Sequence, residues 1–127
     1  MSKIVSIELQ LIEDDVDQYL IKLDNDDNVI IGITNTQWCC EQFGIKITPN
    51  HNSFIGATIN KIRWAWGREE KQYSGDYEGS ATVVVITDKG DLTITAWNNH
   101  NGYYKHDIRV KWSKTDLYDG CCETQTL

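Results

Sequence analysis

Hydrophobic and polar residues alternate along most of this chain, and short clusters of Gly, Asn and Asp interrupt the alternation. Near the start, Ile7, Leu9 and Leu11 fall on one face of an alternating run, and Ile108 and Val110 repeat the pattern near the end. A period of two indicates a β-strand with one buried face. No segment keeps the helical period over three turns. The pattern therefore predicts an all-β fold.

Turn signals divide the alternating segments into about eight strands. Asn and Asp fill residues 24–28, which predicts a turn between the two strands of a hairpin over residues 18–34. Residues 88–91 predict another tight turn, and the pair Asn101-Gly102 is the usual signal of a type I′ hairpin turn. We expect an antiparallel meander of about eight strands, folded as a sandwich or a partly open barrel.

The remaining polar segments are expected to lie outside the strands. Residues 35–44 are irregular, with room for one helical turn, and residues 67–79 predict a long surface loop. A chain of 127 residues predicts one domain whose core needs no disulfide or metal to hold it. We expect residues 1–113 to form this single β domain and residues 114–127 to form a polar C-terminal tail.

The charge of the chain restricts its partners. The net charge is −7 and the pI is about 4.8, so we expect no non-specific binding to nucleic acid or to anionic lipid, which needs a basic face. No run of about 20 apolar residues predicts a membrane span, and the N-terminus lacks the pattern of a signal peptide. The expected location is therefore the cytoplasm. Solubility explains the acidity, and docking onto a basic partner is the alternative.

The four cysteines occur as two adjacent pairs, Cys39-Cys40 and Cys121-Cys122. In a reducing cytoplasm free thiols are the expected state. Structural zinc sites usually separate two cysteines by two to four residues, a spacing that adjacent pairs do not match. The alternative is a metal site made of one cysteine from each pair with His51, His100 or His106. We expect buried free cysteines, no metal and no cofactor.

Aromatic and cationic residues alternate along the segment Arg63-Trp64-Ala65-Trp66-Gly67-Arg68. Core packing explains most of the tryptophans in a small β domain. The functional alternative is an aromatic-lined pocket in which rings stack on a base and arginines hold a phosphate. For that alternative, the predicted ligand-binding residues are Arg63, Trp64, Trp66, Arg68, Tyr103, Tyr104 and Arg109.

Known catalytic motifs are missing from the sequence. The chain has no Gly-x-Ser-x-Gly element, no P-loop and no His-Glu-x-x-His pattern. Its three histidines lie near predicted turns, and its many carboxylates make any single carboxylate pair uninformative. We therefore expect a binding protein and not an enzyme.

Four short motifs follow one another in a recognisable order: Cys39-Cys40-Glu41, Phe54-Ile55-Gly56, Lys89-Gly90 and Asn101-Gly102-Tyr103-Tyr104. In this order the chain resembles an uncharacterised family of small phage and bacterial domains, over residues 18–112. It departs from the family pattern because Trp38 stands where an Asp usually precedes the two cysteines, and because Cys-Cys-Glu is repeated in the tail. The family has no known activity, so the resemblance provides no catalytic residues.

The resemblance implies a phage accessory protein, and small acidic proteins of this class often counteract host defence. With the aromatic and cationic segment, this predicts a non-catalytic protein of the host-cell cytoplasm, acting as a homo-oligomer. It would sequester a small nucleotide-like signalling molecule or mask a host protein. Two alternatives stay open, a metal-dependent enzyme that uses cysteines and histidines, and a structural component of the virion.

Overall fold

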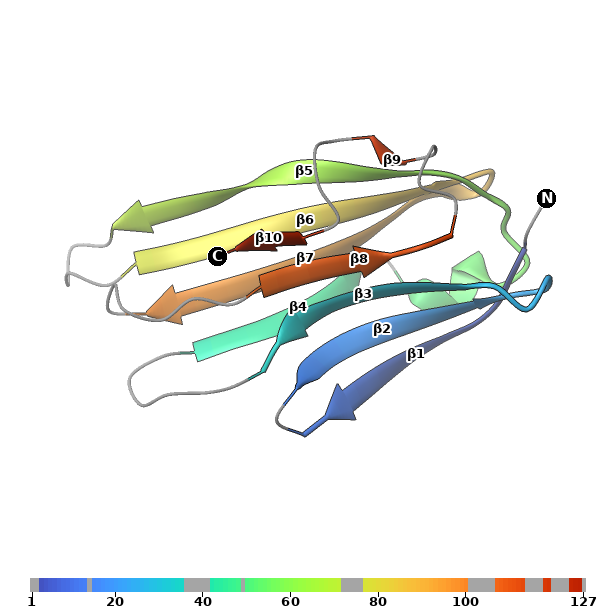
Figure 1. The fold of residues 1–127 in the computed structure, drawn as a ribbon. Coiled ribbons are helices and arrows are strands. Elements are labelled where there is room, and N and C mark those ends of the chain that lie inside the picture. The colour runs from blue at the N-terminus through green and yellow to red at the C-terminus, as the bar shows by residue number, and fades with distance from the viewer. Residues whose placement is uncertain are drawn as a thin grey trace.

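The computed structural model contains two packed β-sheets and the segments that join them (Figure 1). It describes residues 3–13, 15–35, 42–48, 50–71, 77–100, 107–113, 118–119 and 124–126. Only the backbone is described for residues 42–43, 65–71, 77–79, 98–100, 107, 118–119 and 124–126.

The first sheet has five strands in the order β1-β2-β3-β8-β10. These strands are β1 (Ile4–Ile12), β2 (Val16–Leu23), β3 (Asn28–Thr34), β8 (Asp107–Lys111) and β10 (Thr124–Thr126). Every neighbouring pair runs antiparallel. Strands β1 to β3 form a meander, and β8 joins them from a point much later in the chain.

The second sheet has the order β4-β7-β6-β5-β9. Its strands are β4 (Gln42–Thr48), β5 (Ile59–Lys71), β6 (Tyr77–Thr87), β7 (Gly90–His100) and β9 (Tyr118–Asp119), and the 3-10 helix η1 (His51–Phe54) lies between β4 and β5. Strands β5 to β7 form a second meander. Because β4 lies beside β7, these four strands form a Greek key. The short β9 runs parallel to β5.

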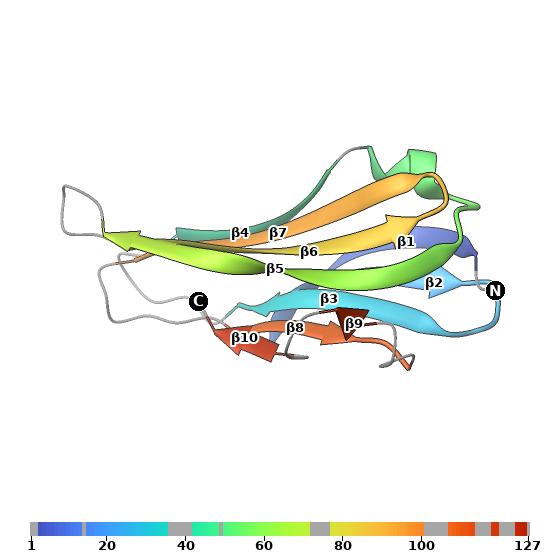
Figure 2. The same ribbon diagram turned by 90° about the horizontal axis from the view of Figure 1, so that it is seen from above.

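Figure 2 shows the two sheets as separate layers, one above the other. The described strands form two five-stranded sheets and do not close into a barrel. The part of the chain that the structure describes contains no α-helix. The predicted all-β fold is therefore confirmed, and it is a sandwich.

The core lies between the sheets and is built mainly from alternate residues of the longer strands. In the first sheet, Tyr19 on β2 pairs with Ile31 on β3, and Ile31 pairs with Val110 on β8. All three side chains are buried. Paired Val83 and Ile94 are buried in the second sheet. The largest fully buried side chains are Ile4, Ile21, Ile31, Ile33, Ile62, Leu92, Ile94, Ile108, Val29 and Val83.

Two predicted turns are confirmed. Between β2 and β3, Asp26 has a φ of 66°, and the side-chain oxygen of Asn25 accepts a hydrogen bond of 3.1 Å from the backbone NH of Asp27. Asn and Asp favour turns for these two reasons. Between β6 and β7, Thr87 pairs with Gly90, so the connection is a tight two-residue turn.

The predicted surface loop over residues 67–79 is wrong at both ends. Strand β5 continues to Lys71 and β6 begins at Tyr77, so the polar residues on either side belong to the hairpin. The register shifts between Ala65 and Arg68, which marks a β-bulge. Backbone hydrogen bonds explain the extension, because residues of any polarity make them.

The strands that flank Asn101-Gly102 do not form the expected hairpin. Residues 101–106 lie outside the described residues, but the two flanking strands belong to different sheets. Strand β7 pairs with β4 and β6, whereas β8 pairs with β3 and β10. The reason is burial, since Ile108 and Val110 complete the core next to β3.

Two other expectations concern irregular segments. The helical turn expected within residues 35–44 falls mainly on residues 36–41, which lie outside the described residues, and residues 42–44 are strand. The expected tail, residues 114–127, contains β9 and β10. These strands pair with β5 and β8, so part of the tail belongs to the two sheets.

Candidate functional site

The outer face of the first sheet carries a row of four residues that lie opposite one another. Gln10 pairs with Gln18, Gln18 with Gly32, and Gly32 with Arg109. Directly paired residues share one face of a sheet, and these four alternate with the residues that face the core. Because Gly32 has no side chain, the row has a gap at its centre.

The close approach of β2 explains why position 32 is a glycine. A Cβ atom on Gly32 would lie 2.8 Å from the Cβ of Gln18 and 3.0 Å from the carbonyl oxygen of Asp17. Both atoms are fixed by the backbone of β2 and cannot rotate away. A glycine inside a strand often marks such a contact.

A hollow with a volume of about 90 Å³ lies beside Gly32 on this face. A more open hollow beside it shares Ile30 and Lys111 with the first. The two hollows together are named the outer groove. Its lining residues are Asp15, Val16, Gln18, Asn28, Ile30, Gly32, Arg109, Lys111, Trp112 and Ser113.

Arg109 and Lys111 give the outer groove its positive charge. They are two residues apart on β8, so their side chains leave the same face of the sheet. Arg109 is half-buried and Lys111 is exposed. Among the residues that the structure describes, neither forms an ion pair. Asp15 is the carboxylate of the groove. Two adjacent cations are notable on a chain whose net charge is −7.

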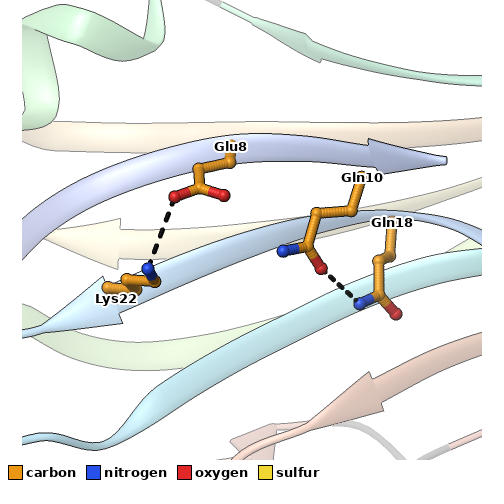
Figure 3. A network of polar contacts seen from close by, with 4 residues as sticks. All are labelled: Glu8, Gln10, Gln18 and Lys22. Atoms are coloured by element: carbon orange, nitrogen blue, oxygen red, sulfur yellow. Dashed lines mark hydrogen bonds and ion pairs between the residues drawn. The ribbon is translucent and has the colours of Figure 1, made fainter. Parts of the chain in front are cut away.

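Two side-chain pairs border the outer groove on β1 and β2 (Figure 3). The Nζ atom of Lys22 lies 3.5 Å from Oε1 of Glu8, and Nε2 of Gln18 donates to Oε1 of Gln10 at 2.9 Å. The ion pair is exposed and contributes little stability, but it neutralises Lys22. The amide pair holds the end of the Gln18 side chain toward β1, away from the hollow beside Gly32.

The structure places the predicted residues Arg63 and Trp64 on opposite sides of the second sheet. Trp64 is 4% exposed and belongs to the hydrophobic core. Arg63, its neighbour on β5, is exposed on the outer face. The two side chains therefore do not share a pocket.

The other predicted binding residues divide into two groups. Trp66 and Arg68 lie on β5, but their side chains are not described, and Tyr103 and Tyr104 lie outside the described residues. Arg109 lines the outer groove on the first sheet. Since Arg63 and Arg109 lie on the outer faces of different sheets, the structure does not bring them together.

Among the residues that line the outer groove, only Arg109 was in the predicted set, and three of the others show what the sequence does and does not report. Lys111 follows Arg109 at the spacing that puts both on one face of a strand, a signal that the sequence contains. Gly32 interrupts a run of Ile and Val in β3, which also indicates a close approach of another chain segment. No sequence signal identifies Gln18, because its place beside Gly32 depends on the register of β2 and β3.

The suggested metal site would draw on two cysteine pairs and three histidines in separate parts of the chain. Cys39-Cys40, Cys121-Cys122 and His106 lie outside the described residues, while His51 begins η1 and His100 ends β7. Within the described segments, no three His, Cys, Asp or Glu side chains are grouped as metal ligands. The metal-dependent alternative stays a prediction. No helix in these segments has the length and apolar character to cross a bilayer.

Comparison with known proteins identifies the chain at the level of its family. No curated protein matches it, and no solved structure matches it. The family model "Domain of unknown function (DUF7448)" matches residues 1–110, which include β1 to β7 and most of β8. The match covers most of the sandwich and much of the outer groove. The chain therefore belongs to the DUF7448 family of domains.

Proposed function

We propose that this protein is a non-catalytic binding domain that holds a small anionic ligand in the outer groove. The observation that carries the proposal is the hollow above Gly32 beside Arg109 and Lys111. Hydrogen bonds from Arg to an anion are about twice as strong as neutral ones. A local excess of cations on an acidic chain also concentrates anions at that face.

A nucleotide-type ligand fits the chemistry of the groove. Its phosphate would contact Arg109 and Lys111, its base would lie on the side chain of Ile30, and the amide of Gln18 would bond to its polar edge. The hollow of about 90 Å³ accepts one group of such a ligand. The more open half of the groove accepts the remainder.

Within this proposal, the domain sequesters a nucleotide-type signalling molecule and thereby counteracts host defence, as a phage protein in the host-cell cytoplasm. The order of its motifs supports the phage setting, because it resembles that of small phage and bacterial domains. The cationic groove supports a small anion over a host protein as the ligand. Masking of a host protein is the alternative within the same class.

Isothermal titration calorimetry with inorganic phosphate, AMP and a cyclic dinucleotide tests the proposal. We expect wild-type protein to bind at least one of these probes, with an affinity that falls as salt is added. Arg109→Ala should weaken binding about tenfold or more, because a lost charge-assisted hydrogen bond costs about 1.5–3 kcal/mol. Lys111→Ala should have a smaller effect, because Lys111 is exposed and solvent screens its charge.

Arg63→Ala is the matched control for Arg109→Ala. It removes the same type of side chain from the outer face of the other sheet, where Arg63 is exposed. The affinity of this variant should equal that of wild type. If Arg63→Ala weakens binding as much as Arg109→Ala, or if none of the three probes binds wild-type protein, the outer groove is not the ligand site.

A further inference from the structure

Exposed hydrophobic side chains gather on one strand at the margin of the first sheet. Where the structure describes side chains, the exposed large hydrophobic residues are Val5, Leu9, Leu11, Ile12 and Ile55. Four of these five belong to β1. Single exposed apolar residues are ordinary, but several together mark an interaction surface.

Leu9 and Leu11 lie on the core-facing side of the sheet. Leu9 pairs with the buried Tyr19, and Ile7, on the same face, pairs with the buried Ile21 and packs against the core. Leu9 is nevertheless 50% exposed and Leu11 is 70% exposed. Figure 1 shows β1 as the outermost strand on its side of the sheet. The apolar row therefore starts in the core and continues uncovered along this edge.

Strand β1 lacks the residues that usually protect an edge strand from pairing. Natural edge strands carry Lys, Pro or inward-pointing charges, and β4, an edge of the second sheet, has the exposed Lys46. On β1 the one ionisable side chain is Glu8, which lies 3.5 Å from Lys22 of the neighbouring strand. The edge is thus long, apolar and without net charge.

We propose that β1 pairs antiparallel with β1 of a second copy of this chain, about a two-fold axis at Leu9. The start of β1 is already bonded within the chain. The backbone NH of Ile4 donates to Ala57 at 2.8 Å, and the NH of Gly56 donates to the carbonyl of Ile4 at 2.7 Å. Residues 6–12 remain for pairing, and Leu9 is their centre.

This register puts no two charged side chains directly opposite each other on either face of the strand. On the core-facing side, Leu9 lies opposite its own copy and Ile7 lies opposite Leu11, so apolar residues meet apolar residues. On the outer side, Glu8 lies opposite Gln10 and Ser6 lies opposite Ile12. Directly opposite apolar pairs stabilise the pairing of two strands.

The charge of the edge favours a second copy over a basic partner protein. The chain has a net charge of −7, yet the carboxylate on β1 is compensated by Lys22. A basic partner would find no unpaired charge here to bind, whereas a second copy would place no carboxylate directly opposite another along the strand. A two-fold pairing uses the same strand on both copies, so it closes at the dimer. The inference does not depend on the ligand proposed above.

Size-exclusion chromatography with light scattering measures the oligomeric mass over protein concentrations from about 1 μM to about 100 μM. Wild type should pass from monomer to dimer in this range. Leu9→Lys should weaken the dimer by about tenfold or more, because two like charges would lie opposite each other at the axis. Val5→Lys is the matched control. Val5 is 53% exposed on the same strand but lies outside residues 6–12, so its dimer should persist.

Hydrogen exchange of the wild-type protein tests the surface without any variant. Those amides of residues 6–12 that do not bond to β2 should exchange more slowly at high protein concentration, while the amides of β4 should not change. A wild-type protein that stays monomeric throughout, or a mass that grows beyond the dimer, would overturn the proposal. Equal loss of the dimer in Leu9→Lys and Val5→Lys would overturn it as well.

Discussion

Each sheet of the sandwich has a glycine in a row of residues on its outer face, and the two glycines have opposite consequences. Gly32 on β3 leaves the outer groove open between Gln18 and Arg109. Gly44 on β4 pairs with Trp97 on β7. There the indole fills the space, because its Cζ2 and Nε1 atoms lie 2.9 Å from where a Cβ of Gly44 would be.

The difference comes from the neighbouring side chains and not from the glycines. Gly32 is buried beside the Cβ of Gln18, but the end of the Gln18 side chain is bonded to Gln10, so a hollow opens beside the glycine. Trp97 instead covers Gly44, as aromatic residues often do for a glycine on an edge strand. A glycine on the outer face of a sheet therefore borders a hollow when the end of the cross-strand side chain turns away from it, as that of Gln18 does. The outer groove is the case that stays open for a ligand.

Substitution at Gly32 should have the largest effect on stability. Gly32→Ala is expected to lower the free energy of unfolding by about 2 kcal/mol, within the range for overpacking. Its Cβ would come within 2.8 Å of the Cβ of Gln18 and 3.0 Å of the Asp17 carbonyl, so β2 and β3 would have to move apart. Urea unfolding of the two proteins measures the difference.

A second substitution at Gln18 tests the geometry of this contact. Gln18→Ala keeps the Cβ atom that Gly32→Ala would strike, so it should not relieve the strain. Added to Gln18→Ala, Gly32→Ala should again remove about 2 kcal/mol from the free energy of unfolding. Recovery of stability in the double variant would show that the contact is with the end of the Gln18 side chain.

Most of the fold follows from the sequence because the alternation of buried residues reports which face each strand turns to the core. The pattern gives no signal where the residues on both faces are mostly polar, which is why the strand residues 67–71 and 77–79 were assigned to a loop. Local signals also do not report which sheet a strand joins. Asn101-Gly102 favours a hairpin, but the fit of Ile108 and Val110 beside β3 decides the pairing of β8.

The candidate site was predictable only in part. Arg109 was in the predicted set, and its spacing from Lys111 is visible in the sequence. The sequence does not show that Arg63 and Arg109 lie in different sheets, because that depends on the strand order. The hollow itself depends on a distance between Gly32 and Gln18, on neighbouring strands, and no local pattern reports such a distance.

Removal of the Trp97 side chain should empty the space next to Gly44. Trp97→Ala takes away the contact with Gly44 and the burial of a half-exposed indole, and we expect a loss of about 1.5 kcal/mol in the free energy of unfolding. Thermal and urea unfolding both measure this loss. An unchanged stability would mean that the indole does not pack on β4 in solution.

Substitution at Gly44 should change sign with its background. In the wild type, Gly44→Ala meets the indole and is expected to cost about 1 kcal/mol. In Trp97→Ala the space is empty, so the same change should stabilise the protein by about 0.5 kcal/mol, because Gly weakens a strand interior relative to Ala. A double-mutant cycle measures both values. If Gly44→Ala changes the stability in the same direction in both backgrounds, the indole of Trp97 is not what opposes a side chain at position 44.

Tyr19 connects the two regions compared above. It lies next to Gln18 on β2, and its phenol hydrogen-bonds with the backbone of Ile47 on β4, the strand that carries Gly44. Burial raises the pKa of Tyr19 above its ordinary value of 10.0, and the bond with Ile47 opposes this rise. The folded state therefore holds the proton more tightly than the unfolded state. Its stabilising effect is complete below about pH 10 and is lost as the pH rises through the folded pKa.

Tyr19→Phe should have the smallest effect, a loss of less than about 1 kcal/mol near pH 8 from the missing hydrogen bond. Above about pH 10 the difference from wild type should shrink, since only the wild type loses stability through ionisation of this phenol when it unfolds. Urea unfolding of both proteins near pH 8 and near pH 11 measures the change, and the other titrating groups cancel in the comparison. A difference that stays constant over this range would contradict this prediction. It would mean that the Tyr19 phenol ionises as readily in the folded protein as in the unfolded chain, and that water reaches the phenol between β2 and β4.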